Sequence, residues 1–311
     1  MSAFGKYAEP FNAECRAFGR LREEGYEELA LSCYGYVLLD EQHERQLMER
    51  FSERRLDFNG NSEHPGFVDV RGHFLGRDGR KPPIRGIVKA LGQPCEQLSN
   101  KDARRILGDI TRMQQLGIVH IDVAIRQLIG GKLADFSTAI TAPHFMTTPE
   151  LNPSLTPDCI FSIEFELFQY TANDFWEFDL MIHEYNEDEG GNISVFAFPS
   201  GLGFEGREGL RNTLSRQRIY TMVDPRLFDW KRKPSTTAAG GSVSGRGSKS
   251  RSRASQTSAV SKPRRRLAAR PPRWYYHCEG EMAEQLRANV SIISSITWKF
   301  KDGHIFPVKR V

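Results

Sequence analysis

Residues 105–150 constrain the fold of this 311-residue chain more than any other stretch. The stretch begins with apolar residues at helical spacing, which are Ile106, Leu107, Ile110, Met113 and Leu116. Gly117 follows, and glycine is the residue that most often ends a helix in the left-handed conformation. Two short apolar runs then flank a Gly-Gly pair at 130–131. The sequence therefore predicts a helix, a loop and a tight turn in close succession.

Several short motifs in and after this stretch resemble the landmarks of the protein kinases. They are His120-Ile121-Asp122 for the His-Arg-Asp of the catalytic loop, Gln127 for its metal-binding Asn, Asp135-Phe136-Ser137 for Asp-Phe-Gly, Thr148-Pro149-Glu150 for Ala-Pro-Glu, and Asp174-Phe175-Trp176 for the Asp-x-Trp of a buried helix. Each motif is weak alone because short motifs recur by chance, but together they follow the kinase order. The resemblance implies that Asp174 caps the backbone of the catalytic loop.

The resemblance also implies roles for single residues if the chain is active. Asp122 would be the base that orients an acceptor hydroxyl, and His120 would support the loop. Asp135 and Gln127 would hold Mg²⁺ against the phosphates of ATP, because phosphoryl transfer depends on positioning and charge neutralisation. Glu14, on an amphipathic helix predicted over residues 10–21, would be the acid that pairs with a strand lysine beside ATP. A plain surface helix with a solvated Glu14 is an equal alternative on pattern alone.

Only part of a kinase small lobe is expected. Residues 31–39 and 84–91 are typical of two strands beside the cleft. About ten residues precede the predicted helix, which is too few for a Gly-rich hairpin and a strand that carries the ATP-binding lysine. We therefore expect both features to be absent, so that Glu14 lacks its lysine partner. Either the reduced lobe is natural or the sequence is a truncated piece of a fuller domain.

Departures from the kinase pattern favour weak or absent catalysis. They are Ile121 in place of Arg, Ala124 in place of Lys, Gln127 in place of Asn, and Ser137 in place of Gly. Loss of one preorganised electrostatic contact commonly lowers a rate by about 10² to 10³. Several losses together predict a pseudokinase, although Asp122 and Asp135 remain.

A second resemblance is carried by phrases of sequence. ECRAFGRL, CYGYVLL, IRGIVK, LGIVHIDV, DFSTAITAPHF and LNPSLTP, which lie between about residues 8 and 185, resemble a fungal family of kinetochore proteins. This is the Fta-two-type subunit of the Sim-four complex, whose members also resemble carriers of a degenerate kinase-type loop. The resemblance implies protein partners and a kinetochore location.

The formal net charge of +4 hides a division along the chain. Residues 231–273 contain 13 of the 43 Lys and Arg and no Asp or Glu, so the rest carries 30 basic against 39 acidic residues, a net charge of −9. Because this Ser/Gly/Pro/Arg stretch has little to bury, it is predicted to be disordered. Its basic clusters, 231–233 and 262–266, could serve nuclear import or bind nucleic acid, or form a solvated linker.

Other chemistry is not indicated. The five cysteines form no Cys-x-x-Cys pair, so the sequence predicts neither a zinc site nor a disulfide framework. No signal-peptide core and no apolar run near the roughly 18 residues of a membrane span is present, which predicts an intracellular protein, with a nuclear location suggested by the basic clusters.

The expected fold class is α+β, a protein-kinase-like fold with a truncated N-terminal lobe and a mainly α-helical C-terminal lobe. The expected domains are a kinase-like domain at 8–230 (small lobe 8–98, large lobe 99–230), a disordered basic linker at 231–273, and a small C-terminal element at 274–311. Three functions stay open: an impaired kinase-like scaffold for protein partners, an active ATP- and Mg²⁺-dependent phosphotransferase on a protein or a small molecule, and a nucleic-acid binder acting through the basic linker.

Overall fold

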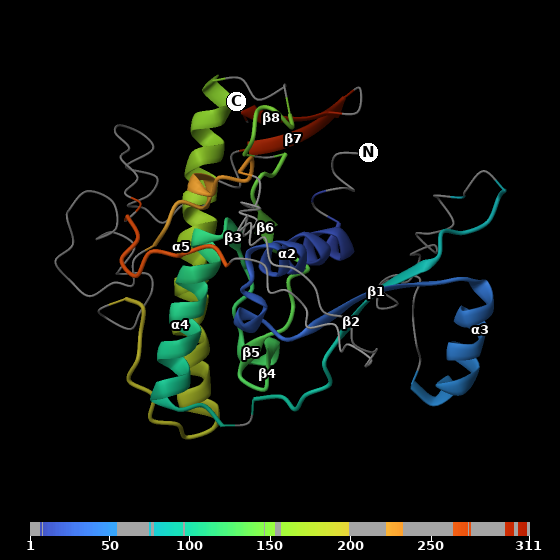
Figure 1. Cartoon of the computed structure of the whole chain (residues 1–311), viewed down its shortest axis with the longest axis horizontal. Helices are drawn as coiled ribbons and strands as arrows, with labels where there is room; N and C mark the ends of the chain where they lie inside the picture. The colour runs from blue at the N-terminus through green and yellow to red at the C-terminus, as the bar shows by residue number, and fades with distance from the viewer. Residues whose placement is uncertain are drawn as a thin grey trace, which may run out of the picture.

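The computed structural model describes residues 7, 9–54, 75, 78–95, 97–145, 147–152, 157–198, 222–232, 264–272, 274, 296–301 and 304–309, without the side chains of 157–166 and of the last two ranges. Within these ranges the fold is mixed, with helices and small antiparallel two-stranded sheets (Figure 1). The larger elements are α2 (Pro10–Glu24), β1 (Cys33–Leu39), α3 (Glu41–Arg50), β2 (Ile84–Lys89), α4 (Asn100–Gln115) and α5 (Pro157–Asp188).

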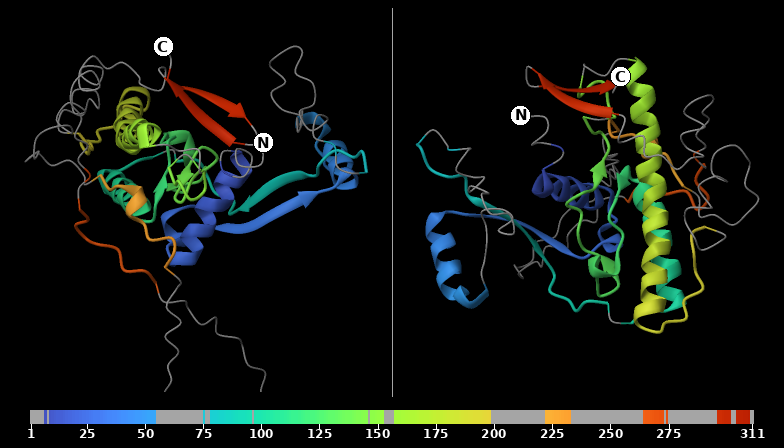
Figure 2. Two further views of the ribbon diagram at one scale, coloured as in Figure 1. Left: turned by 90° about the horizontal axis from the view of Figure 1, so that it is seen from above. Right: turned by 180° about the vertical axis from the view of Figure 1, so that it is seen from behind.

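Two helices far apart in sequence, α4 and α5, lie side by side and form the centre of the core (Figures 1 and 2). The predicted apolar stripe of α4 is buried, with Ile106, Leu107, Ile110 and Met113 each at most 1% exposed. It packs in one cluster with apolar residues of α5, which include Phe175, Phe178, Met181 and Ile182. The helix ends as predicted, because Gly117 adopts φ 73° directly after it.

Short strand pairs connect the loops that follow α4. β3 (Ile118–Val119) pairs with β6 (Ile140–Thr141), and β4 (Leu128–Ile129) pairs with β5 (Lys132–Leu133). Gly130 and Gly131 both have positive φ, at 55° and 72°, which is the backbone that a two-residue hairpin turn requires. The Gly-Gly turn predicted from sequence is thereby confirmed.

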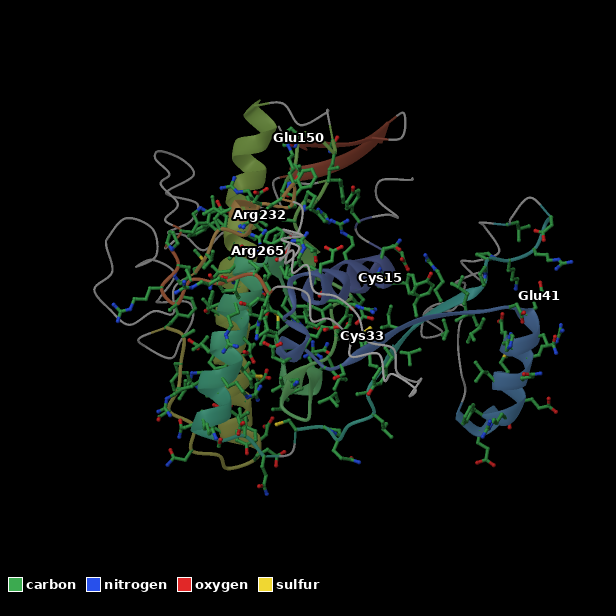
Figure 3. The ribbon with its side chains drawn as sticks, in the orientation of Figure 1. Cys15, Cys33, Glu41, Glu150, Arg232 and Arg265 are labelled. Atoms are coloured by element: carbon green, nitrogen blue, oxygen red, sulfur yellow. The ribbon has the colours of Figure 1, made fainter. Side chains whose placement is uncertain are left out.

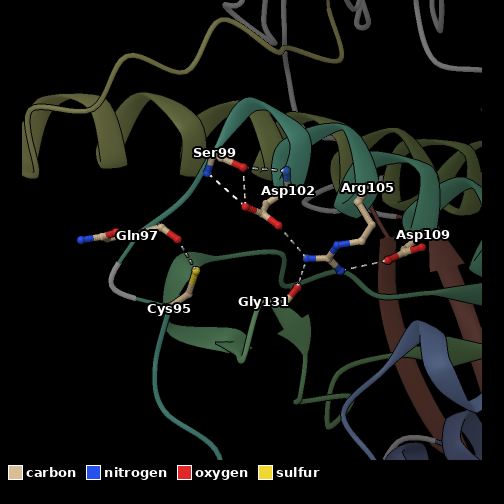
Figure 4. Close-up of polar contacts among 7 residues, drawn as sticks. All are labelled: Cys95, Gln97, Ser99, Asp102, Arg105, Asp109 and Gly131. Carbon is tan, nitrogen blue, oxygen red and sulfur yellow. Dashed lines mark hydrogen bonds and ion pairs between the residues drawn. The ribbon is translucent and has the colours of Figure 1, made fainter.

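Arg105 fastens this turn to the start of α4 (Figure 4). Its Nη2 donates to the carbonyl of Gly131 at 2.7 Å, and its Nη1 lies 3.5 Å from Oδ2 of Asp109. A side chain at position 131 would collide with it, since a Cβ there would lie 2.9 Å from Arg105 Nη2. Ser99 and Asp102 form a capping box that fixes the first turn of α4. Arg105 therefore links the turn to a helix whose first turn is capped.

Helix α2 matches the helix predicted at 10–21 and extends it to residue 24. Its buried face consists of small and apolar residues, including Ala13, Ala17 and Leu21. Arg20 also enters the interior, where Nη1 donates to Leu116 O at 2.8 Å and Nη2 to Ala142 O at 2.7 Å. Arg16 donates to the carbonyls of Thr141 and Pro143. These two arginines join α2 to the ends of α4 and β6.

The predicted strands at 31–39 and 84–91 are confirmed as β1 and β2, an antiparallel pair with Tyr36 opposite Ile87. The pair forms a ribbon that extends from the body of the protein toward α3 (Figure 2). Several large apolar side chains on or just after it are exposed, namely Tyr34, Tyr36, Leu38 and Leu91. In the described residues no third strand joins this sheet.

The region after residue 150 differs from expectation in one respect. The sequence suggests a connection at 151–157, an ambiguous stretch and then a buried helix, whereas α5 is one continuous helix of 32 residues. The pair Asp302-Gly303 between two apolar runs predicts a hairpin, and this prediction is confirmed by β7 (Ile296–Lys301) and β8 (His304–Lys309), whose register places Lys301 opposite His304. The sequence also predicts helices within 210–230 and at 279–289. The described part of the first range, 222–230, has only the 3₁₀ helix η5 (Pro225–Leu227), and the rest of both ranges lies outside the described residues.

Part of the stretch predicted to be a disordered linker is packed against the body. Residues 264–272, called the docked segment below, run past the C-terminal end of α2, and Trp274 after them packs edge-on against Phe168 of α5 at 5.2 Å. The prediction for 231–273 overlooked this because it weighed composition alone, and the segment has side chains that fit specific acidic and aromatic partners. The remainder of that prediction lies mostly outside the described residues.

Candidate functional site

Glu14 of α2 and Lys89 of β2 form a largely buried ion pair. Lys89 Nζ lies 2.5 Å from Glu14 Oε1 and also donates to Ala134 O at 2.7 Å. The same Glu14 oxygen accepts from the backbone N–H of Phe136 at 3.0 Å. The side chains of Glu14 and Lys89 are 10% and 23% exposed. The pair joins the helix, the ribbon and residues 134–136 at one point.

The expectation that Glu14 lacks a lysine partner was therefore wrong. That inference searched for a lysine before the helix, where the kinase order places it. Here the lysine follows the helix in the chain and comes from the last residue of β2. Antiparallel pairing of β1 and β2 returns the end of β2 to the base of the ribbon, where Lys89 lies opposite Cys33 and within reach of α2.

The loop at 120–127 is supported from below by Asp174 of α5, which is fully buried. Asp174 accepts hydrogen bonds from the backbone N–H groups of His120 at 3.1 Å and Ile121 at 2.7 Å, as predicted. Burial raises the pKa of Asp174 to about 7, although these hydrogen bonds act in the opposite direction. Ile121 has φ 75°, an unfavourable value for a β-branched residue, and Asp174 holds its N–H in that conformation.

His120 is a packing residue in this arrangement. It is 1% exposed, and its ring meets Phe136 edge-on with centroids 4.8 Å apart. Burial lowers the pKa of His120 to about 4, so the ring is neutral near pH 7. The geometry agrees with a supporting role for His120 in the loop.

Both carboxylate oxygens of Asp122 already have partners. Oδ1 forms an ion pair with Arg126 Nη2 at 2.5 Å, and Oδ2 accepts from Gln127 Nε2 at 2.8 Å. Arg126 and Gln127 belong to a 3₁₀ turn at Ile125–Gln127, which places them one turn beyond Asp122. Each carboxylate oxygen has a second lone pair, so a substrate hydroxyl would either share Asp122 with these contacts or displace one of them.

Asp135 is ionised and partly enclosed. Burial would raise its pKa, but hydrogen bonds from the backbone and hydroxyl of Ser137 and the charge of Lys89 outweigh this effect, so its pKa is lowered. Its Oδ1 accepts from Ser137 N at 2.8 Å. The carbonyl of Gln127 accepts a hydrogen bond at 2.9 Å from the N–H of Ala134, the residue before Asp135. The two predicted metal-binding residues therefore lie on neighbouring, hydrogen-bonded segments.

The described side chains offer few ligands for a metal ion. Among the described residues there is no group of three or more His, Cys, Asp and Glu that could hold an ion. Asp135 and Gln127 would supply oxygens of the kind that Mg²⁺ prefers, and nucleotide phosphates and water would have to supply the rest. Binding of Mg²⁺ together with ATP at these two residues stays a prediction.

A cavity of about 240 Å³ lies apart from these residues, between α2 and the ribbon. Cys15, Phe18 and Leu21 of α2 line one side, and Cys33 and Ile87 line the other. Figure 3 labels Cys15 on α2 and Cys33 at the start of β1. Burial is the main cause of the raised pKa of the Cys15 thiol, and the raised pKa keeps the thiol protonated. No predicted site residue lines the cavity.

Comparison with known proteins adds a kinetochore link. A family model described as kinetochore Sim4 complex subunit FTA2 matches residues 1–140. Over these residues the chain is similar to that family. The matched range begins before α2, ends at Ile140, the first residue of β6, and includes Glu14, Lys89, Asp122 and Asp135. No curated protein and no solved structure gives a significant match.

Sequence reasoning missed Lys89, Arg126 and the arginines of α2. The spacing of Arg16 and Arg20 was a usable signal, because residues four apart share one face of a helix. Arg126 four residues after Asp122 follows the same logic. Lys89 had no such local signal, since its pairing with Glu14 depends on how the ribbon folds back.

None of the helices in the described ranges combines the length and the hydropathy needed to cross a bilayer.

Proposed function

We propose that this protein is a catalytically impaired kinase-like protein that serves as a protein-binding subunit of a kinetochore complex. The observation that carries the proposal is the state of Asp122. Around it the framework of the site is assembled, with Lys89 on Glu14 and Asp174 beneath the loop. Asp122 itself is held by Arg126 and Gln127. The geometry supports a fold that keeps a kinase-like scaffold while its would-be base is engaged internally.

The family match supports the kinetochore part of the proposal, because the matched family is described as a kinetochore complex subunit. A subunit of a complex needs surfaces for partners. The ribbon offers one, since Tyr34, Tyr36 and Leu38 are 71%, 64% and 54% exposed. Exposed apolar side chains gathered on one element are typical of interaction surfaces. A nuclear location and the binding of protein partners are therefore part of this proposal.

Turnover of ATP tests the proposal directly. We expect the purified chain with ATP and Mg²⁺ to release phosphate no faster than the Asp122→Asn variant. Asp188→Asn, at the exposed end of α5, is the matched control for loss of one carboxylate. Hydrolysis that Asp122→Asn abolishes and Asp188→Asn leaves intact would overturn the impaired state.

The Lys89–Glu14 pair favours a second candidate, an active ATP- and Mg²⁺-dependent phosphotransferase. In kinases such a pair positions the nucleotide phosphates. This candidate expects a rise in melting temperature when ATP and Mg²⁺ are added together, because a ligand that binds only the folded state stabilises it. The rise should be lost in Lys89→Met. A folded sample whose melting temperature does not respond to ATP and Mg²⁺ would remove this candidate and leave the scaffold.

A further inference from the structure

The C-terminal end of α2 carries a built site for an extended basic peptide. Gly25 ends the helix with φ 73°, and the following turn presents Tyr26 and Glu28 next to Glu24. Tyr26 is buried in the core, yet its hydroxyl donates to the carbonyl of Arg265 at 2.6 Å. The site is thus formed by a rigid aromatic residue flanked by two carboxylates.

The docked segment (264–272) satisfies this site through both its side chains and its backbone. Arg265 Nε lies 2.8 Å from Glu24 Oε2, and the two side chains are only 19% and 17% exposed. Arg265 also stacks over Phe228 and donates to Asp229 O at 3.0 Å. One arginine is therefore bound by a carboxylate, a carbonyl and an aromatic face.

Neighbouring contacts extend the recognition along the peptide. Arg264 forms an ion pair with Glu28 and stacks 3.7 Å from the ring centroid of Tyr26. Gln115 of α4 binds Ala268 in both directions, accepting from its N–H at 2.9 Å and donating to its carbonyl at 3.2 Å. Leu267 packs against the core between these points. The pattern of contacts reads as Arg-Arg-x-Leu-Ala.

We propose that this site is a docking site for the chain's own Arg-Arg-x-Leu-Ala sequence, and that docking withholds the basic cluster from polyanions such as the phosphate backbone of DNA. The guanidinium groups that pair with Glu24 and Glu28 are those that phosphates would need. A carboxylate paired with a guanidinium cancels most of its positive charge, so the docked and the phosphate-bound states compete with each other. The inference does not rest on the proposed kinase-like function.

The contact between the docked segment and its site is suited to release. Its outer ion pair, Arg264 with Glu28, is about half exposed on both sides, so water and salt screen it strongly. A polyanion offers many phosphates close together, and release of their counterions drives binding of Lys and Arg. DNA can therefore compete for the basic cluster at low salt and should lose the competition as salt rises.

Anisotropy of a short fluorescein-labelled DNA duplex, titrated with the full chain, tests the proposal. Glu24→Gln/Glu28→Gln removes both carboxylates of the site. Glu23→Gln/Glu27→Gln is the matched control, because these exposed residues lie on the same turn and form no ion pair within the described part of the chain. We expect the first double variant to bind roughly tenfold more tightly than the control, with a salt slope steeper by about two.

Equal affinities of the two double variants would overturn the proposal, as would absence of DNA binding by all three proteins. A second measurement tests the proposal if the Glu24→Gln/Glu28→Gln variant fails to fold. A labelled peptide of residues 264–270 is added to the full chain in which residues 264–270 are replaced by a Gly/Ser stretch of equal length, because this also removes Leu267 and Ala268, which would otherwise stay in the site. Binding of this peptide, and not of one with both arginines replaced by alanine, is expected; no binding would refute a docking site.

Discussion

Lys89 and Glu14 form the contact on which the candidate site depends. One oxygen of Glu14 accepts from two donors, Lys89 Nζ and Phe136 N, so Glu14 links α2 to residues 134–136. Breaking a buried ion pair from one side leaves a charge without its partner, which costs more than the pair itself contributes. The site should therefore be more sensitive to loss of Lys89 than an exposed lysine would be.

We predict that Lys89→Met lowers the free energy of unfolding by about 2 kcal/mol, less than for a fully buried pair because Lys89 is partly solvated. Urea denaturation measures the change. Lys101→Met, on the exposed first turn of α4, is the control and should change stability little. If both variants unfold at the same urea concentration as the native chain, the ion pair does not hold the site together.

His144 provides a pH-dependent contribution. Burial, with the nearby charge of Arg16, lowers its pKa to about 3, and its ring contacts Tyr7 and Phe145. Because the pKa is depressed in the folded state, the unfolded chain binds a proton that the folded chain does not between pH 6.5 and about 3. Stability from His144 is thus complete above its ordinary pKa and decreases as the pH falls through this window.

We predict that the stability difference between the native chain and His144→Gln shrinks by about 2 kcal/mol from pH 7 to pH 5. The difference is the right measure, because the raised pKa values of Asp109, Asp174 and Asp179 act with the opposite sign in the same range. Thermal unfolding at each pH reports it. A difference that stays constant would mean that His144 titrates normally in the folded protein.

At the residue scale, the sequence predicts contacts that a motif or a short spacing specifies. It misses contacts between residues that meet only because the chain folds back on itself. The support of the loop by Asp174 was predictable because the motif names both partners and the helix that carries one of them. The link between Lys89 and Glu14 joins residues 75 positions apart in an order that the kinase pattern does not contain. The partners of Asp122 were visible in sequence, but only geometry shows that both of its oxygens are occupied.

At the scale of elements, α2 is anchored by buried arginines as well as by apolar packing. Arg20 spans two carbonyls that belong to different elements, Leu116 after α4 and Ala142 after β6, and lies over Phe228. Its planar fork reaches both carbonyls at once, which an ammonium on a flexible chain cannot do with the same geometry. Burial lowers the pKa of Arg20 to about 10, which still leaves it charged at neutral pH.

We predict that Arg20→Lys costs about 1 to 3 kcal/mol of stability, because one buried carbonyl loses its donor. Arg22→Lys, one step along the same helix and exposed, is the matched control. Chemical denaturation of both variants measures the effect. Equal stabilities would show that water or another donor satisfies the released carbonyl, and that the fork of Arg20 does not stabilise the position of α2.

Elements were predictable where local signals agree. The helix α4 has an apolar stripe, a capping box and Gly117, and β4–β5 and β7–β8 have two-residue turns between apolar runs. The continuity of α5 was not predictable, because proline and mixed polarity before residue 170 gave conflicting signals. Its apolar side packs against α4, and tertiary burial outweighs weak local preference.

At the scale of the whole molecule, the described residues 264–272 and 274 belong to the same folded unit as the helices. Pro271 is buried, Leu267 and Trp274 pack against the core, and Trp274 N donates to Met222 O at 3.0 Å. The acidic body and the basic late segment, whose charges are separated along the sequence, meet at Glu24 and Glu28. The charge division seen in the sequence is therefore complementary in space.

This arrangement predicts different costs for two changes in the late part of the chain. Leu267→Ala/Trp274→Ala should destabilise the entire unit by about 3 kcal/mol in one cooperative transition, because it removes apolar area from the common core. Deletion of residues 240–255 should leave stability unchanged, since about 15 residues remain between Arg232 and Arg264 and can span roughly 50 Å. Differential scanning calorimetry distinguishes the two. A separate low-temperature transition in the double variant, or an equal loss in the deletion, would mean that the late segment is not part of the cooperative core.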